Sequence, residues 1–207
     1  MEGYQRMRNA KEGLGKLEKI VDTLIIIPND KLIEIVPDVS LATAFKVADE
    51  ILVNAVKGIT ELVTRPGLVN LDFADIRAVM SNGGLAMIGM GDSDTETRAQ
   101  EAVERALNNP LLDVDVTGAK GALINVSGGN DVTIRECKDI VEAVSTRLNP
   151  DAKIIWGAQI IKELGDSVRT MLIITGVNSP QIFGPQKTFV SAKRKEIEKT
   201  LGVEFIE

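Results

Sequence analysis

The spacing of apolar and polar residues changes several times along the chain, and each change predicts a separate element. Apolar residues recur with helical period over residues 3–18, and again from Ser40, a suitable N-cap, to the Pro66-Gly67 pair. Shorter helical patterns cover residues 96–108 and 133–148. Apolar runs, several of them rich in β-branched residues, predict strands over residues 24–27, 85–90, 122–126, 154–160 and 168–175.

This alternation of helices and strands predicts an α/β fold. The elements between residues 71 and 177 are sufficient for a two-layer α/β domain. The strand at residues 24–27 stands apart, and a lone apolar strand leaves its backbone groups unpaired. It therefore either joins the later sheet or has partners that are absent. The helix that ends before Pro66 is about 25 residues and roughly 40 Å long, which is enough to be shared by two domains.

Composition removes several classes of function. Of the 207 residues, 44% are apolar, which is enough to fill a core. There is no histidine, which excludes His-based triads and the usual zinc sites, and the one cysteine, Cys137, lies in a helical pattern that favours a packing role. A net charge of −6 without a basic stripe argues against nucleic-acid binding. No apolar stretch reaches roughly 20 residues, so we expect a cytoplasmic protein without membrane insertion.

Two aspartates stand three residues apart where the long helix gives way to the next one. Asp72 and Asp75 share one side of the first turn of that new helix, close enough to act on one water or one cation. From the residues alone, helix capping is favoured, because carboxylates at a helix start bind free backbone N–H groups. Alternatively, the pair could give an unrelated α/β enzyme a weak Mg²⁺ site.

The run Gly89-Met90-Gly91-Asp92 superficially resembles a dinucleotide-binding turn between a strand and a helix. It lacks the third glycine, and Asp92, Asp94 and Glu96 would repel phosphate where a helix start should attract it. The same acids lack the glycine and the final glutamate of a calcium loop. We therefore expect a solvated helix start here.

Residues 64–80, Thr-Arg-Pro-Gly-Leu-Val-Asn-Leu-Asp-Phe-Ala-Asp-Ile-Arg-Ala-Val-Met, closely resemble the synergy loop of FtsZ, the tubulin-like cell-division GTPase. Residues 22–32 resemble the family's sixth strand and the loop after it, and residues 44–50 its central helix. The resemblance continues through residues 80–89 and 127–131, which are similar to its C-terminal domain.

The resemblance implies a division of the chain into four parts. These are a remnant of a Rossmann-like GTPase domain with the long central helix (1–65), a connecting loop (66–70), a two-layer α/β tubulin-like C-terminal domain (71–177) and a tail (178–207). It also favours absent partners for the strand at residues 24–27, because the family's nucleotide-binding domain precedes that strand.

In the FtsZ family, the synergy loop reaches across a subunit contact and completes the GTPase site of the next molecule. The resemblance therefore implies a cell-division protein that forms GTP-dependent filaments head to tail, with catalytic roles for Asp72 and Asp75, and with Asn70 fixing the loop or a cation. It also implies contacts to GTP or GDP, accompanied by Mg²⁺, from Glu2, Arg6, Asn29, Phe45 and Asp49. Structural alternatives for these five residues are a surface ion pair, a turn residue, a core aromatic ring and a surface acid.

The family's Gly-rich phosphate-binding loop has no counterpart in this sequence. We therefore expect that the chain alone does not hold GTP firmly and is inactive by itself. Other cell-division proteins are further expected partners, and the division site is the expected location. A different class of function stays open: a stand-alone, non-hydrolytic FtsZ-like domain that caps or regulates filaments.

Overall fold

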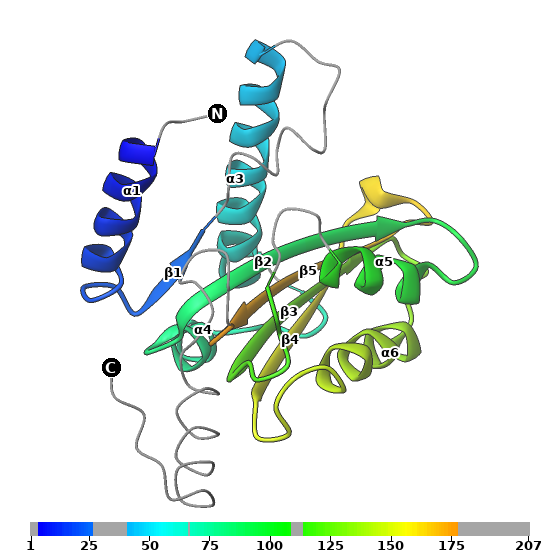
Figure 1. Ribbon diagram of the computed structural model, residues 1–207. Coiled ribbons are helices and arrows are strands. Elements are labelled where there is room, and N and C mark those ends of the chain that lie inside the picture. Colours follow the sequence, from blue (N-terminus) through cyan, green and yellow to red (C-terminus); the bar gives the residue numbers. More distant parts are fainter. Residues whose placement is uncertain (1–3, 27–40, 66, 109–113, 178–207) are drawn as a thin grey trace, which may run out of the picture.

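A mixed five-stranded sheet organises the computed structural model, which describes residues 4–26, 41–65, 67–108 and 114–177 (Figure 1). The strand order is β1-β2-β5-β3-β4. β5 runs antiparallel to both of its neighbours, whereas the two outer pairs, β1 with β2 and β3 with β4, are parallel. The strands are β1 (Thr23–Ile25), β2 (Gly84–Ser93), β3 (Gly121–Gly128), β4 (Lys153–Ile160) and β5 (Val168–Thr175).

The helices lie close to the positions predicted from the apolar period. They are α1 (Tyr4–Leu17), α3 (Leu41–Thr64), α4 (Phe73–Met80), α5 (Arg98–Leu107) and α6 (Ile134–Ser145), with a short 3-10 turn η1 (Lys162–Leu164). The α/β fold class is therefore confirmed. For α5 and α6 the pattern was readable because each carries one apolar side that faces the core.

One face of the sheet packs against α5 and α6. Every residue of β3 is buried, and its side chains Ala122, Ile124 and Val126 join Val103 of α5 and Ile140 of α6 in one apolar cluster. Cys137 belongs to the same cluster, and burial raises the pKa of its thiol. The packing role expected for this cysteine is therefore confirmed, and this face forms the main core.

The opposite face packs against α4 and part of α3. Ile76 and Val79 of α4 contact Leu123 and Ile173 of the sheet. At α3, a Cβ on Gly58 would lie 2.1 Å from the sulfur of Met171, so helix and sheet meet without space for a side chain. Farther toward its start, α3 carries exposed apolar residues, namely Leu52, Val53 and Val56.

The lone strand joins the later sheet. β1 pairs in parallel with the start of β2, placing Thr23 beside Gly84 and Ile25 beside Ala86. The expectation that its partners are absent is therefore wrong. The physical reason is that the edge of β2 offers unpaired backbone groups, which an adjacent extended apolar segment can satisfy.

The two glycines of the suspected dinucleotide turn lie inside β2, because this strand extends to Ser93. A Cβ on Gly89 would lie 2.0 Å from the carbonyl oxygen of Ala106, and one on Gly91 would lie 2.2 Å from that of Ala102. These glycines therefore let α5 approach the strand closely. Asp94 and Glu96, which precede α5, are exposed, as expected of a solvated helix start, whereas the exposed Asp92 lies in β2.

Candidate functional site

The segment that leads from the end of α3 into the first turn of α4 and carries the two aspartates, residues 67–75, is called the acidic loop below. It is tied to the edge strand β4 at a single residue. The N–H groups of Leu68 and Val69 donate to the carbonyl oxygen of Ala158 at 2.8 and 3.2 Å, and the N–H of Ala158 donates back to Val69 at 3.2 Å. Leu71 is buried beside Gly157, where a Cβ would crowd it at 3.1 Å. The loop is therefore held by backbone pairing and by an apolar anchor.

The aspartates of this loop form a reciprocal capping box at the start of α4. The N–H of Asp75 donates to Oδ1 of Asp72 at 2.8 Å, and the N–H of Asp72 donates to Oδ2 of Asp75 at 3.1 Å. The capping role that the residues alone favour is therefore confirmed. Because the cap uses one oxygen of each carboxylate, the other oxygen of each lies outside it.

Asn70 closes the loop from within. Its Oδ1 accepts a hydrogen bond from the N–H of Gly67 at 2.6 Å. A Cβ on Gly67 would lie 2.5 Å from the carbonyl oxygen of Ala158, so only glycine fits between the loop and β4. Of the two roles expected for Asn70, fixing the loop is the one that this bond favours.

The surroundings of the two aspartates are open and partly apolar. Asp72 is exposed and Asp75 half-buried, and within the described part of the chain neither forms an ion pair. Phe73 between them is 64% exposed, with the guanidinium of Arg77 5.5 Å from its ring centre, and Leu68 is 62% exposed. Exposed apolar side chains around unpaired carboxylates are typical of a surface that meets another molecule.

No group of three or more metal-ligating side chains is arranged to hold a metal ion among the described residues. At Asp72 and Asp75 a magnesium ion would have at most two carboxylate ligands, and water or another molecule would supply its remaining octahedral positions.

The predicted nucleotide contacts are only partly described by the structure. Glu2 and Asn29 lie outside the described residues, as does the side chain of Phe45, although its backbone is part of α3. Arg6 is exposed on α1, and Asp49 is exposed on α3. The structure therefore describes the side chains of only two of these five residues, Arg6 and Asp49.

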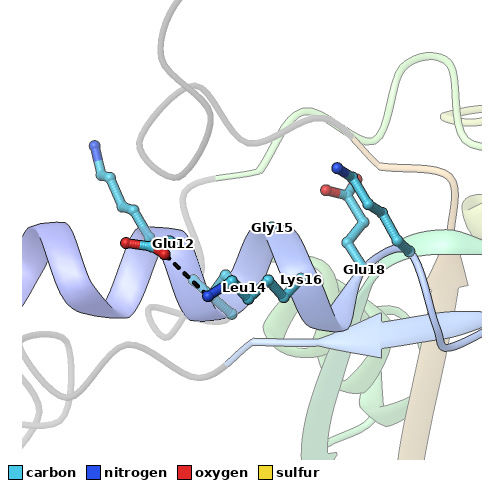
Figure 2. Close-up of a pocket in the computed structure, with 7 residues that line it drawn as sticks. Glu12, Leu14, Gly15, Lys16 and Glu18 are labelled. Carbon is cyan, nitrogen blue, oxygen red and sulfur yellow. Dashed lines mark ion pairs between the residues drawn. The ribbon is translucent and has the colours of Figure 1, made fainter.

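A hollow beside α1 is lined by neither Arg6 nor Asp49, the two predicted contacts whose side chains the structure describes (Figure 2). Its lining comes from α1 and the turn after it, including an exposed pair of Lys16 and Glu12 at 2.9 Å. The lysines lie toward the C-terminal end of the helix, where the helix dipole disfavours an anion. This hollow is a poor candidate for a phosphate site.

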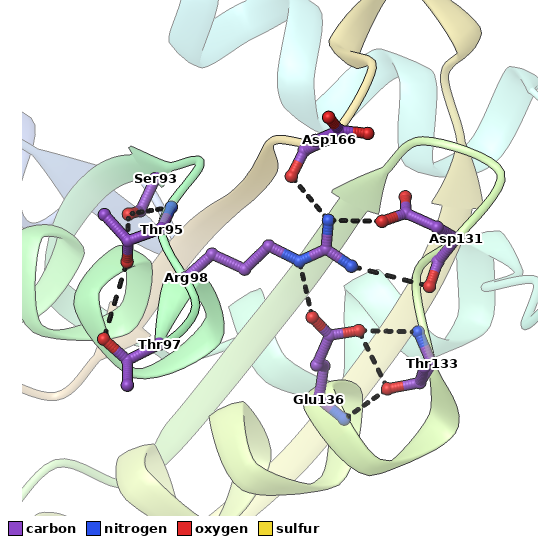
Figure 3. Close-up of polar contacts among 8 residues, drawn as sticks. All are labelled: Ser93, Thr95, Thr97, Arg98, Asp131, Thr133, Glu136 and Asp166. Atoms are coloured by element: carbon purple, nitrogen blue, oxygen red, sulfur yellow. Dashed lines mark hydrogen bonds and ion pairs between the residues drawn. The ribbon is translucent and has the colours of Figure 1, made fainter.

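A second polar arrangement, missed by the sequence analysis, centres on Arg98 at the start of α5 (Figure 3). Its Nε donates to Glu136 and its Nη1 to Asp131, both at 2.6 Å, and Nη1 also donates to the carbonyl oxygen of Asp166. The side chain of Arg98 is only 12% exposed. Its partners lie 33, 38 and 68 residues away in sequence, so no local pattern could have revealed them.

The charges in this cluster stabilise one another. Hydrogen bonding to Glu136 raises the pKa of Arg98 above its ordinary value. Burial acts to raise the pKa of Glu136, but hydrogen bonds from Arg98 and Thr133 outweigh it, and the pKa is lowered overall. Arg98 and Glu136 therefore both stay ionised at neutral pH.

Residues 84–178 match the family model described as FtsZ family, C-terminal domain. The cell division protein FtsZ 1 of Methanocaldococcus jannaschii is 58% identical over 200 residues, which are 97% of this chain and 54% of that protein. The chain is a homologue of archaeal FtsZ. Its match to FtsZ 1 of Thermococcus kodakarensis is 59% identical over 87% of this chain and 48% of the relative. The chain thus spans about half the length of these FtsZ relatives.

Solved structures agree with this assignment to the FtsZ family. An empty FtsZ dimer from M. jannaschii superposes with a TM-score of 0.78 and 60% sequence identity, covering 84% of this chain and 51% of that one. CetZ1 from Haloferax volcanii, 20% identical, has a TM-score of 0.74 over 93% of this chain and 57% of that one, which shows a shared fold. Among the described helices, none is both long and apolar enough to span a bilayer.

Proposed function

We propose that the chain supplies the catalytic loop of a head-to-tail FtsZ filament, with Asp72 and Asp75 acting on GTP bound by the neighbouring subunit. The observation that carries this proposal is the acidic loop itself. Two carboxylates are fixed in a capping box on a loop that is anchored to β4, yet both lack an ion pair within the described residues. A carboxylate pair serving stability alone would gain from a basic partner, whereas one used on another molecule must stay accessible.

The arrangement suits the hydrolysis of a phosphate anhydride. Phosphoryl transfer requires little covalent chemistry from the protein and depends on positioning and electrostatics. The oxygens of Asp72 and Asp75 outside the cap can accept hydrogen bonds from the attacking water and orient it. Asn70 serves as a loop-holding residue through its bond to Gly67, which limits the positions that the two aspartates can adopt.

The nucleotide is GTP before hydrolysis and GDP after it, with Mg²⁺ bound to its phosphates. In this proposal the neighbour's phosphate-binding loop holds it, because this sequence contains no Gly-rich counterpart. Glu2, Arg6, Asn29, Phe45 and Asp49 stay proposed contacts of an incomplete nucleotide site in this chain. The chain alone is therefore expected to show no GTP turnover.

Self-association is supported by the relatives, since one similar solved structure is an FtsZ dimer. A contact in which the loop of one subunit meets the nucleotide of the next is heterologous, and its repetition produces a filament. We place this filament at the division site, together with other cell-division proteins.

A complementation assay tests the proposal. The acceptor is full-length M. jannaschii FtsZ in which the two residues that align with Asp72 and Asp75 are replaced by alanine, and it is used once GTP binding without turnover of its own has been measured. Adding this chain should restore GTP turnover in proportion to the number of contacts formed between the chain and the acceptor. A chain carrying both Asp72→Ala and Asp75→Ala should not, whereas the control Asp94→Ala, at an exposed acid outside the cap, should act like the unmodified chain.

The assay also separates catalysis from capping. If the chain binds the acceptor and lowers the polymer mass of unmodified FtsZ without restoring any turnover, the catalytic assignment fails and a filament cap is the better description. Phosphate release and sedimentation, measured on the same mixtures, report these two outcomes.

A further inference from the structure

The C-terminal end of α4 is held by two threonine hydroxyls that come from different strands. Thr175 of β5 donates to the carbonyl oxygen of Val79 at 3.2 Å, and Thr23 of β1 donates to the carbonyl oxygen of Met80. The last carbonyl groups of a helix have no partner within the helix, and these hydroxyls supply partners for two of them. The end of α4 is therefore fastened to both β1 and β5.

The two threonines converge on one glycine in the turn after α4. A Cβ on Gly83 would collide with the hydroxyl oxygen of Thr23 and would lie 3.1 Å from the side chain of Thr175. The same turn is held by Asp22, whose carboxylate accepts a hydrogen bond from the N–H of Asn82 at 3.3 Å. The helix end, the turn and the two strands therefore meet without space for another side chain.

The packing of the sheet does not by itself require a hydroxyl at Thr175. The residue is 1% exposed, and the residues before it in β5, Ile173 and Ile174, are apolar core residues. Valine has nearly the same shape and would bury no polar atom. The hydroxyl has two acceptors within reach, the carbonyl oxygen of Val79 at 3.2 Å and, less closely, that of Gly121 at 3.4 Å. It therefore adds what a methyl group cannot, a hydrogen bond to the end of α4.

The opposite end of α4 carries the two proposed catalytic carboxylates. Asp72 is the N-cap of this helix, and Asp75 lies in its first turn. Because α4 has eight residues, the end bound by the threonines and the capped end are only about 12 Å apart. Between them, Ile76 and Val79 pack against the sheet. A short packed helix transmits displacement, so a shift at one end changes the position of the other.

We propose that Thr23 and Thr175 are positioning residues, which act through α4 to hold Asp72 and Asp75 in the geometry required for GTP hydrolysis on the neighbouring subunit. This inference rests on the proposed function, but it assigns no chemical step to either threonine. A catalytic group displaced by about 1 Å loses much of its effect, and the two hydroxyls limit such a displacement. Because Thr23 belongs to β1, this support also depends on the pairing of β1 with β2.

The test uses valine substitutions, which keep the shape of the side chain and remove its hydroxyl. A chain carrying both Thr23→Val and Thr175→Val is added to the alanine-substituted full-length FtsZ described above, with sedimentation and phosphate release measured separately. Maximal GTP turnover at saturating chain should fall about tenfold, whereas the half-saturating concentration should stay unchanged. Thr23→Ser and Thr175→Ser should keep the turnover of the unmodified chain, because serine retains the hydroxyl.

A role in stability alone predicts a different result. Partial unfolding would lower the fraction of competent chain, so the half-saturating concentration would rise while maximal turnover stayed the same. The matched control Thr60→Val removes an exposed hydroxyl of α3, which bonds to Val56 of its own helix at 2.8 Å, and should act like the unmodified chain. The single variant Thr23→Val, at a half-buried position, should lower maximal turnover about threefold. It gives a result even if Thr175→Val does not fold.

Hydrogen exchange in the chain alone tests the support of α4 without the catalytic assignment. The amide groups of α4 should exchange about tenfold faster in the double valine variant than in the unmodified chain, and at the unmodified rate in the serine variants.

The two proposals fail in different ways. Unchanged maximal turnover in folded valine variants overturns the positioning role and leaves the catalytic loop unaffected. If instead the unmodified chain binds without restoring turnover, the proposed function fails. Faster exchange at α4 would then still show that the hydroxyls hold the helix, and unchanged exchange would overturn that support as well.

Discussion

Two helices of this protein begin with the same reciprocal capping box, and the two boxes are put to different use. In α4 the box is Asp72 with Asp75, and in α6 it is Thr133 with Glu136. Both satisfy the free N–H groups of a helix start. The acid of the α6 box also binds Arg98, whereas neither aspartate of the α4 box has an ion pair within the described residues.

The difference lies in what surrounds each box. Glu136 accepts hydrogen bonds from Arg98 of α5 and from Thr133 at the start of its own helix, and Arg98 neutralises its charge within the protein. Asp72 sits on a loop at the sheet edge, and its charge faces outward. A capping box therefore orients a carboxylate through local hydrogen bonds. The tertiary environment then decides whether that carboxylate stabilises the fold or acts on another molecule.

The largest expected effect comes from removing the charge of the α4 box while keeping its cap. Asp72→Asn retains a good N-cap, so unfolding free energy should change by less than about 0.5 kcal/mol. Restored GTP turnover in the complementation assay should fall about 100-fold, because the amide is a poorer acceptor for the attacking water. Phosphate release and urea unfolding measure the two quantities. Unchanged GTP turnover with Asp72→Asn would show that the carboxylate of the α4 box, like that of the α6 box, has no catalytic role.

The next effect concerns the partner of the α6 box. Arg98→Ala leaves Glu136 without its ion pair in a half-buried position and should lower the free energy of unfolding by about 2–3 kcal/mol. A double-mutant cycle with Glu136→Gln should show favourable coupling between the two residues. Arg105→Ala, which breaks an exposed pair with Glu101 and a bond to the carbonyl oxygen of Asp92, should lower the free energy of unfolding less than Arg98→Ala does. Equal losses of unfolding free energy in Arg98→Ala and Arg105→Ala would contradict the larger effect expected for Arg98.

Removal of the caps compares the two boxes directly. Asp72→Ala and Thr133→Ala should each lower the free energy of unfolding by about 1 kcal/mol. Thr133→Ala should be the more destabilising of the two, since the Thr133 hydroxyl also donates to Glu136 at 2.8 Å. Urea unfolding of both variants in the same buffer tests this order. A larger loss of unfolding free energy for Asp72→Ala than for Thr133→Ala would contradict it.

The smallest effect is a dependence of stability on pH. The pKa of Glu136 is lowered in the folded state from its ordinary value of 4.5, so the unfolded state binds protons first as the pH falls. The stabilisation by Glu136 is thus complete above pH 4.5 and is lost as the pH falls through the lower folded-state pKa. Unfolding free energies measured between pH 7 and 3 should decline less steeply for Glu136→Gln. Parallel profiles would show that this carboxylate is not selectively stabilised.

Much of the fold and part of the candidate site were predictable from neighbouring residues. Helical period located α1, α3, α5 and α6, and the position of Asp72 and Asp75 at a helix start predicted a capping role, although not its reciprocal form. The resemblance of the surrounding segment then assigned the family, which the comparisons confirm. The proposed catalytic role of the loop is still a prediction.

Other features could not be read in the same way. The glycines of β2 had the spacing of a turn, but the approach of α5 made them part of a strand. Strand β1 was expected to lack its partners, although the edge of β2 accepts it. Asn70 could have fixed the loop or a cation, and its bond to Gly67 became visible only in the folded loop.

The sequence by itself determined the order of helices and strands and the local cap that aims two carboxylates, because these depend on residues within one or two turns of each other. The tertiary structure alone decided that Arg98 would join three distant segments, that the acidic loop would be anchored at Ala158, and that Asp72 would face outward. Such contacts join residues tens of positions apart, and their existence depends on how the whole chain packs around the sheet.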